Sequence, residues 1–287
     1  MISDIKVHTA THLDDAYSWL AEYGDKGKVL AGGTDLMVYL NAKSFIAPAY
    51  LDIWRLNELR FVREDGDFIV LGAMSTYTDI IESPVIRQYA PILVDAAKTV
   101  GAAQIQNRGT IGGNIVNASP AGDTLPVFAV FDAELEIGSS RGTRTVPFNE
   151  FYTGYRKTVL KPDELLLSVR LNKKNFLNHQ SFRKVGTRRA QAISKVVIAI
   201  NSTTQSGKID SIKIGIGSVA PTVIRASKTE SFLLDQTINQ ASLSEASKLL
   251  KDDISPIDDI RSTARYRTTV ASNILRRILM NLAEESR

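Results

Sequence analysis

The sequence contains no cysteine in its 287 residues and only three histidines, His8, His12 and His179. The lack of cysteine excludes disulfide frameworks, Cys-ligated zinc, Cys-ligated iron–sulfur clusters and thiol nucleophiles within this chain. His8 and His12 are close in sequence, but no third ligand is evident beside them. We therefore expect no metal site in this chain, and much of the redox chemistry that side chains support is excluded.

The chain also lacks a dominant charge and a long apolar run. Lys and Arg number 35 against 31 Asp and Glu, a net charge of +4, and the basic residues are dispersed. This balance does not favour a nucleic-acid partner. The N-terminus has no basic region followed by an apolar run, and no window approaches about 18 consecutive apolar residues. We therefore expect a soluble, cytoplasmic protein without membrane insertion.

The composition is that of a globular chain, with 44% hydrophobic and 23% charged residues. Helical periodicity predicts an amphipathic helix over 13–23, capped by Thr11, and a long helix over 264–283. A polar connector at 172–175 separates a region with glycine turns from a region of sheet and terminal helices. We predict an α+β protein with an N-terminal region, 1–172, and a C-terminal domain, 176–287. Strands are expected at 50–53, 68–71, 180–185, 195–201 and 211–216, with a hairpin turn at 206–208.

The first of two glycine turns is Ala31-Gly32-Gly33-Thr34-Asp35-Leu36, between a short apolar run and a predicted short helix over 36–40. Adjacent glycines permit positive φ and let successive N–H groups converge on an anion, and Thr34 adds a hydroxyl donor. A diphosphate suits this geometry. The same residues also fit a plain strand-to-helix turn with Thr34 or Asp35 as its N-cap.

The second glycine turn is Thr110-Ile111-Gly112-Gly113-Asn114, followed by the loop Ser119-Pro120-Ala121-Gly122-Asp123. It repeats the combination of threonine, paired glycines and a small polar residue. Neither turn has the glycine spacing of a Rossmann or P-loop motif. We therefore expect one anionic ligand to be held between two separate turns, each supplying bare backbone amides.

Together the two turns and the Ser-Pro-Ala-Gly-Asp loop resemble the FAD-binding loops of the medium subunit of molybdenum hydroxylases, the family that includes xanthine dehydrogenase and aerobic carbon monoxide dehydrogenase. The resemblance continues through 164–168, 182–184, 188–189, 259–261 and 266–267, and thus covers nearly the whole chain. It implies a two-lobed FAD-binding domain of the vanillyl-alcohol oxidase type, with lobes of about 1–55 and 56–172. A smaller α+β C-terminal flavoprotein domain would follow.

The resemblance also implies which residues contact FAD, and it assigns no catalytic residue. Asp123 would accept hydrogen bonds from FAD hydroxyls, Lys184 would lie near the flavin ring or its ribityl chain, and Val100 and Leu166 would pack nearby. Val100 and Leu166 fit equally well as core residues, and Asp123 could instead cap a turn. The two loops would hold the diphosphate from both sides, through Val29, Leu30, Ala31, Gly32, Gly33, Thr34, Asp35 and Leu36 on one and Thr110, Ile111, Gly112, Gly113 and Asn114 on the other.

The function implied by the resemblance is electron transfer through FAD, because a flavin carries the redox chemistry and the protein binds and tunes it. Electrons would arrive from [2Fe–2S] clusters on a small partner chain and leave to an acceptor such as NAD. A large partner chain would hold the molybdopterin cofactor, giving a heterotrimer. Two alternatives stay open: a non-redox assembly or scaffold subunit that retains the fold, and a free-standing flavin reductase, which the C-terminal stretch disfavours.

Overall fold

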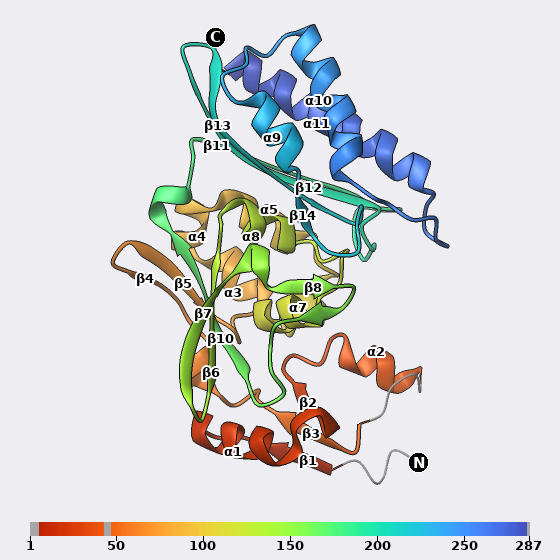
Figure 1. Ribbon diagram of the computed structural model, residues 1–287. Coiled ribbons are helices and arrows are strands. Elements are labelled where there is room, and N and C mark those ends of the chain that lie inside the picture. Colours follow the sequence, from red (N-terminus) through yellow and green to blue (C-terminus); the bar gives the residue numbers. More distant parts are fainter. Residues whose placement is uncertain (1–5, 43–46, 286–287) are drawn as a thin grey trace.

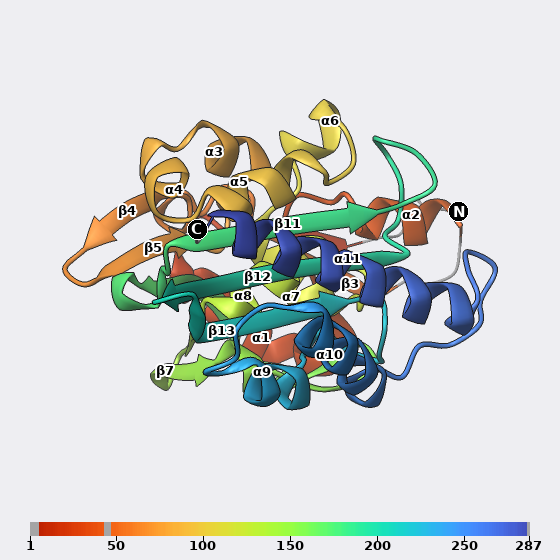
Figure 2. The ribbon, with the colours of Figure 1, turned by 90° about the horizontal axis from the view of Figure 1, so that it is seen from above.

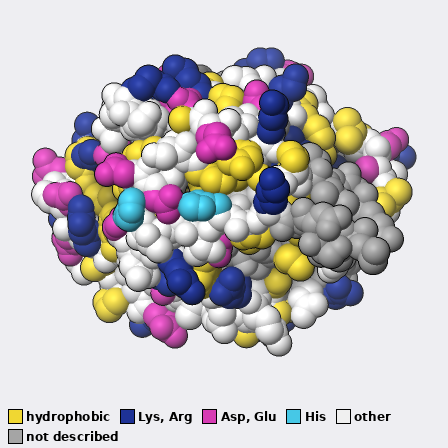
Figure 3. All heavy atoms as spheres, turned by 90° about the horizontal axis from the view of Figure 1, so that it is seen from below, with side chains coloured by type: hydrophobic (Ala, Val, Ile, Leu, Met, Phe, Trp, Pro, Cys, Tyr) yellow, Lys and Arg dark blue, Asp and Glu magenta, His cyan; other side chains and the backbone are white. Residues whose placement is uncertain are grey.

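The computed structural model describes residues 6–42 and 47–285, which are arranged in three tiers from the N-terminal lobe to the C-terminal helices (Figure 1). The main β-sheets of the three tiers have three, five and four strands, and the second tier also contains a two-stranded sheet. Seen from below, the first tier presents Lys, Arg, Asp and Glu side chains interspersed with apolar ones (Figure 3). None of the described helices is long and apolar enough to cross a membrane.

The first tier is a parallel sheet of order β1-β3-β2, covered by helix α1 (Leu13–Tyr23). Helix α1 buries Ala16, Tyr17 and Leu20, three of the positions that its periodicity predicts. The expected cap is wrong, because the ring of His12, not Thr11, accepts the Asp15 amide at 3.2 Å. The other elements here are β1 (Lys6–Thr9), β2 (Gly27–Leu30), β3 (Ala49–Asp52) and α2 (Leu36–Asn41).

The second tier is an antiparallel sheet of order β4-β5-β10-β6-β7, with short helices packed against it around the largest apolar core. Its strands are β4 (Val62–Asp65), β5 (Phe68–Gly72), β6 (Glu134–Ser139), β7 (Gly142–Pro147) and β10 (Leu165–Asn172), beside the small hairpin β8 (Tyr152–Gly154) and β9 (Lys157–Thr158). Its helices are α3 (Tyr77–Glu82), α4 (Pro84–Tyr89), α5 (Pro91–Lys98), α6 (Ala103–Gln106), α7 (Ile111–Asn117) and α8 (Leu125–Val130).

The third tier is an antiparallel sheet of order β11-β12-β13-β14, seen from above in Figure 2. Helices α9, α10 and α11 cover one face and share a core with it, while Ala199 and Phe182 join the core of the second tier. Ser206 and Gly207, at φ +50° and +75°, form the hairpin turn that the sequence predicts. The elements are β11 (His179–Val185), β12 (Val196–Gln205), β13 (Lys208–Gly217), β14 (Ile224–Arg225), α9 (Ser227–Leu233), α10 (Gln240–Asp253) and α11 (Ala264–Glu285).

Polar contacts join the second and third tiers. The connector at Lys173–Asn175 is one 3₁₀ turn, and the side-chain Nδ2 group of Asn175 donates to the Phe131 carbonyl at 2.9 Å. Arg225 pairs with Asp132 at 2.8 Å across the tiers, and Lys213 contacts the same carboxylate. These contacts show that the two tiers pack together. The division into 1–172 and 176–287 stays our proposal for the domain boundary.

Candidate functional site

The two glycine loops lie against each other, although they are far apart in sequence. A Cβ on Gly32 would stand 1.7 Å from the Arg108 carbonyl oxygen, so only glycine permits this approach. A Cβ on Gly113 would stand 3.9 Å from that of Ala31. The loop after strand β2 and the start of helix α7 therefore lie against each other between the first and second tiers.

The first loop leaves its backbone donors free. It begins where β2 ends, with the Leu30 carbonyl accepting the Ile53 amide at 3.0 Å, and it ends at helix α2. Gly33 has φ +78°, a conformation that glycine adopts without strain. Among the described residues, no acceptor pairs with the amides of 31–36. Six successive amides in a short turn form a concave donor surface that suits an anion.

The second loop is different, and the expectation of bare amides there is wrong. Its glycines lie in the first turn of helix α7, where the Thr110 hydroxyl accepts the Gly113 amide at 3.1 Å. The Ile111 and Gly112 amides donate to the carbonyls of Ser75 and Ala73 at 3.0 and 2.9 Å. A Cβ on Gly112 would stand 2.7 Å from the Ala73 carbonyl oxygen, so this glycine allows the two backbones to pack closely.

Side chains of the second loop remain available in place of its amides. The side-chain Oδ1 of Asn114 accepts from the Thr124 hydroxyl at 2.9 Å, whereas its Nδ2 group donates to no described residue. The Gly112 and Ile111 backbone is buried, while Gly113 and Asn114 are half-buried. The surface that this loop can offer a ligand is therefore the Gly113 backbone face and the Asn114 amide group.

Asp123 and Lys184 form a buried ion pair at 2.6 Å between the second and third tiers. Their side chains are 9% and 8% exposed. Lys184 also donates to the Thr99 carbonyl at 2.9 Å, and the Ser194 hydroxyl donates to the second Asp123 oxygen at 2.5 Å. Burial raises the pKa of Asp123, and the attraction of Lys184 opposes that rise. Two predicted site residues thus contact each other directly.

The apolar site candidates differ in their surroundings. Leu166 is 4% exposed on strand β10, within the main core. Val100 is half-buried and packs against the same core. Val29, by contrast, is 37% exposed at the edge of the first tier. Leu166 and Val100 therefore pack in the core, while their contact with FAD stays a prediction; Val29 has a partly exposed side chain.

Three side chains that sequence reasoning missed also converge on the site. Tyr77 is buried, its amide donates to the Gly109 carbonyl at 3.1 Å, and burial with the nearby charges of Asp123 and Asp35 raises its pKa far above the usual range. Arg156, at φ +52° on the β8–β9 hairpin, donates to Asn117 Oδ1 at 3.1 Å, and its charge acts on Asp35. Ser194 is the third, and its hydroxyl donates to Asp123. No sequence motif marks these three residues, because they lie in segments far from the glycine loops in the sequence.

The sequence of the chain matches two family descriptions that together span most of its length. Residues 3–173 match "FAD binding domain in molybdopterin dehydrogenase", and residues 181–282 match "CO dehydrogenase flavoprotein C-terminal domain". The chain belongs to the FAD-binding subunits of the molybdenum hydroxylases. These matches confirm the α+β fold with an FAD-binding domain and a C-terminal flavoprotein domain. They also confirm the prediction that the chain is a component of an oxidoreductase.

Relatives of this molybdenum hydroxylase subunit match nearly end to end. The carbon monoxide dehydrogenase medium chain of Hydrogenophaga pseudoflava is 31% identical over 95% of this chain and 94% of its own. A putative xanthine dehydrogenase FAD-binding subunit of Escherichia coli (strain K12) is 32% identical with the same coverage. The solved carbon monoxide dehydrogenase of H. pseudoflava, in a form lacking the Mo-pyranopterin moiety, superimposes with TM-score 0.91 at 29% identity, covering 95% of both chains.

Proposed function

We propose that this subunit binds FAD between its two glycine loops and transfers electrons within a molybdenum hydroxylase complex. Electrons enter from [2Fe–2S] clusters on a small partner chain, and they leave to an acceptor such as NAD. A large partner chain holds the molybdopterin cofactor and selects the substrate. The observation that carries this proposal is the run of six unpaired amides at 31–36, packed directly against the second loop.

The first loop fits the diphosphate bridge of FAD. Its free amides and the Thr34 hydroxyl supply donors for the phosphate oxygens, and the glycines remove side chains that would hold the ligand away. The exposed Val29 and the half-buried Leu36 border this donor surface. Backbone donors give geometric specificity without a fixed positive charge, so the diphosphate would keep some contact with solvent cations.

The second loop and its downstream residues complete the proposed site. The Asn114 amide group donates to the ligand from the opposite side, and the Gly113 face allows close approach. Asp123 is held by Lys184 and Ser194, each on a different oxygen, so further lone pairs remain for ligand hydroxyls. Val100 and Leu166 exclude water from behind these groups.

Bound FAD would supply the electron chemistry, accepting and releasing electrons singly or in pairs. The residues of this chain would bind FAD, orient it and shield it from water. Lys184 places a positive charge at the boundary between the FAD-binding domain and the C-terminal domain, and Asp123 neutralises part of it. The balance between these two charges would set how strongly the site stabilises the negatively charged, reduced form of the flavin ring.

Flavin titration tests this proposal. The purified chain, stripped of ligand, should take up one FAD per chain. The bound FAD should show the absorption band of oxidised flavin at about 450 nm and quenched flavin fluorescence. Co-purification with partner chains should then give a complex that reduces an added acceptor. No flavin uptake at all would contradict the proposal and favour the scaffold alternative.

A further inference from the structure

Arg156 lies at the turn of the β8–β9 hairpin, which Figure 1 shows beside helix α7 and above helix α2. Its backbone has φ +52°, a left-handed conformation that glycine adopts freely and that residues with side chains disfavour. Strained backbone of this kind is often found at functional sites. The contacts of the Arg156 side chain therefore indicate what this residue does.

The guanidinium of Arg156 contacts an element from each half of the candidate site. Its Nη1 donates to Asn117 Oδ1 at 3.1 Å, at the end of helix α7. Asn117 follows Gly113 by four residues, so both lie on one face of α7. The Arg156 Cζ also lies 5.8 Å from the centre of the Tyr39 ring, on helix α2 directly after the first loop. The positive charge is therefore held where the two loops meet.

Arg156 forms no ion pair with a carboxylate of the described residues. Arg144, by contrast, pairs with Glu164 at 2.7 Å. The polar groups that Arg156 contacts, such as the Asn117 amide oxygen and the Tyr155 hydroxyl at 3.5 Å, are neutral. Its charge is thus available to an anion that enters the site.

Asp35 gives the first loop a negative charge of its own. Desolvation raises the pKa of Asp35, and the charge of Arg156 opposes that rise. The Asp35 carboxylate would repel a diphosphate held by the neighbouring amides, because like charges oppose each other strongly in a partly desolvated site. The backbone donors of the loop carry no full charge to offset this repulsion. Arg156 is placed to supply that charge.

We propose that Arg156 binds the diphosphate bridge of FAD and closes the donor surface of the first loop from the side of the hairpin. Its planar guanidinium matches two phosphate oxygens and stays charged at physiological pH. This inference rests on the proposed function, in which FAD lies between the glycine loops. It adds a charged contact from a third segment, the β8–β9 hairpin, which no glycine motif marks.

Titration of the FAD-free chain with FAD tests this role. Arg156→Gln should raise the FAD Kd about tenfold at low salt, and Arg156→Lys should raise it less, because lysine keeps the charge without the planar fork. Added salt should weaken FAD binding to the wild type more than to Arg156→Gln. Lys157→Gln is the matched control, since it removes the same charge from the next, exposed residue of the hairpin. Equal losses in Arg156→Gln and Lys157→Gln would overturn the proposal, because they would show a general effect of charge.

ADP separates the diphosphate from the flavin, because it carries the same diphosphate bridge without the ring. In calorimetric titrations, Arg156→Gln should raise the Kd of ADP by a factor similar to that for FAD. An unchanged ADP Kd beside a weakened FAD Kd would overturn the proposal, since Arg156 would then contact another part of FAD.

Asp35→Asn distinguishes binding of the diphosphate from neutralisation of Asp35. This variant keeps the loop amides and removes a negative charge, so it should bind FAD at least as tightly as the wild type. In that background, Arg156→Gln should still raise the FAD Kd about tenfold. A loss that disappears there would overturn the proposal, because Arg156 would then act only on Asp35.

The FAD-free variants at Arg156 and Lys157 should melt at the wild-type temperature, because both side chains are exposed. An FAD Kd for Arg156→Gln within twofold of the wild type would overturn the role of Arg156 and leave the proposed function intact. A wild-type chain that binds no FAD would instead contradict the proposed function.

Discussion

The loops at 31–36 and 109–114 each contain a Gly-Gly pair, yet their backbone amides meet different partners. Those of 31–36 donate to no described acceptor, whereas those of Ile111, Gly112 and Gly113 are bonded to Ser75, Ala73 and Thr110. Paired glycines can thus serve either to expose backbone donors or to let two backbones pack closely. In this subunit each loop does one of these, and the proposed diphosphate site combines them.

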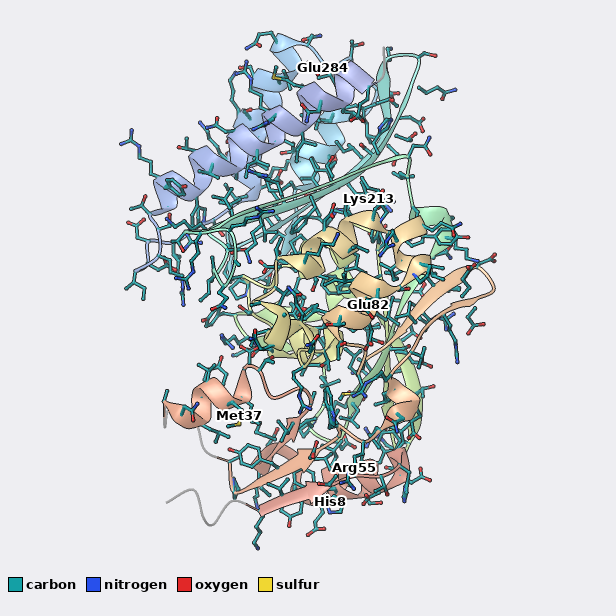
Figure 4. All side chains as sticks on the ribbon, turned by 180° about the vertical axis from the view of Figure 1, so that it is seen from behind. His8, Met37, Arg55, Glu82, Lys213 and Glu284 are labelled. Carbon is teal, nitrogen blue, oxygen red and sulfur yellow. The ribbon has the colours of Figure 1, made fainter. Side chains whose placement is uncertain are left out.

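The two loops also differ in how firmly the protein holds them. Ile111 is fully buried in the main core, and α7 is fixed by its threonine cap. Helix α2, which follows the first loop, has no buried residue; Met37 and Val38 are 51% and 63% exposed, and Figure 4 shows Met37 on the side away from the second tier. Fewer tertiary contacts give the first loop the lower local stability. We infer a fixed half and an adaptable half of the site.

The largest effect is expected at the charges just beyond the fixed loop. Asp123→Ala leaves the Lys184 ammonium buried without its partner, which costs roughly 3–5 kcal/mol of unfolding free energy. The double variant Asp123→Ala with Lys184→Met should recover much of that stability, as measured by urea unfolding of the FAD-free chain. If the double variant also bound FAD as tightly as the wild type, the pair would be purely structural.

The second-largest effect is expected where the two loops contact each other. Gly32→Ala places a methyl group 1.7 Å from the Arg108 carbonyl oxygen and must separate the loops. We expect roughly hundredfold weaker FAD binding, about 3 kcal/mol. Gly215→Ala is the matched control, because its Cβ would meet the Pro126 carbonyl oxygen at 2.4 Å, away from both loops. Equal losses of FAD affinity in both variants would mean that general destabilisation, and not loop contact, is responsible.

A smaller effect separates packing from binding within the second loop. Gly112→Ala crowds the Ala73 carbonyl at 2.7 Å and should lower the unfolding free energy of the FAD-free chain by about 1–3 kcal/mol. Since the Gly112 amide is already bonded, FAD affinity should fall less than stability does. Thermal melting with and without FAD measures both; a large affinity loss with unchanged stability would restore the bare-amide interpretation of this loop.

Much of this fold follows from local pattern. The periodicity of 264–283 predicts helix α11, and Ser206-Gly207 predicts the hairpin turn, because those signals lie in neighbouring residues. The resemblance of the loops identifies the family and its FAD-binding domain. The individual FAD contacts, from Val29 to Lys184, stay predictions.

Pattern could not reveal how the second loop uses its amides. Their acceptors are carbonyls of Ala73 and Ser75, and every residue has a carbonyl, so no side-chain motif marks them. The Asp123–Lys184 pair and the Ser194 hydrogen bond depend on how the second and third tiers pack. Those contacts need the tertiary structure, because the sequence separates their members widely.

The smallest effect tests the adaptable loop alone. Gly33→Ala meets only the flexible side chains of Leu30 at 3.3 Å and Met37 at 3.8 Å, so its main cost is backbone strain at φ +78°, about 1–2 kcal/mol. Gly207→Ala carries the same strain at φ +75°, with nothing within 4 Å, on a distant hairpin. Both variants should lose similar stability without FAD, but Gly33→Ala alone should bind FAD roughly tenfold more weakly, since it distorts the free amides (about 1.4 kcal/mol). Matching FAD affinities in calorimetric titrations would show that the amides of 31–36 are not the diphosphate donors.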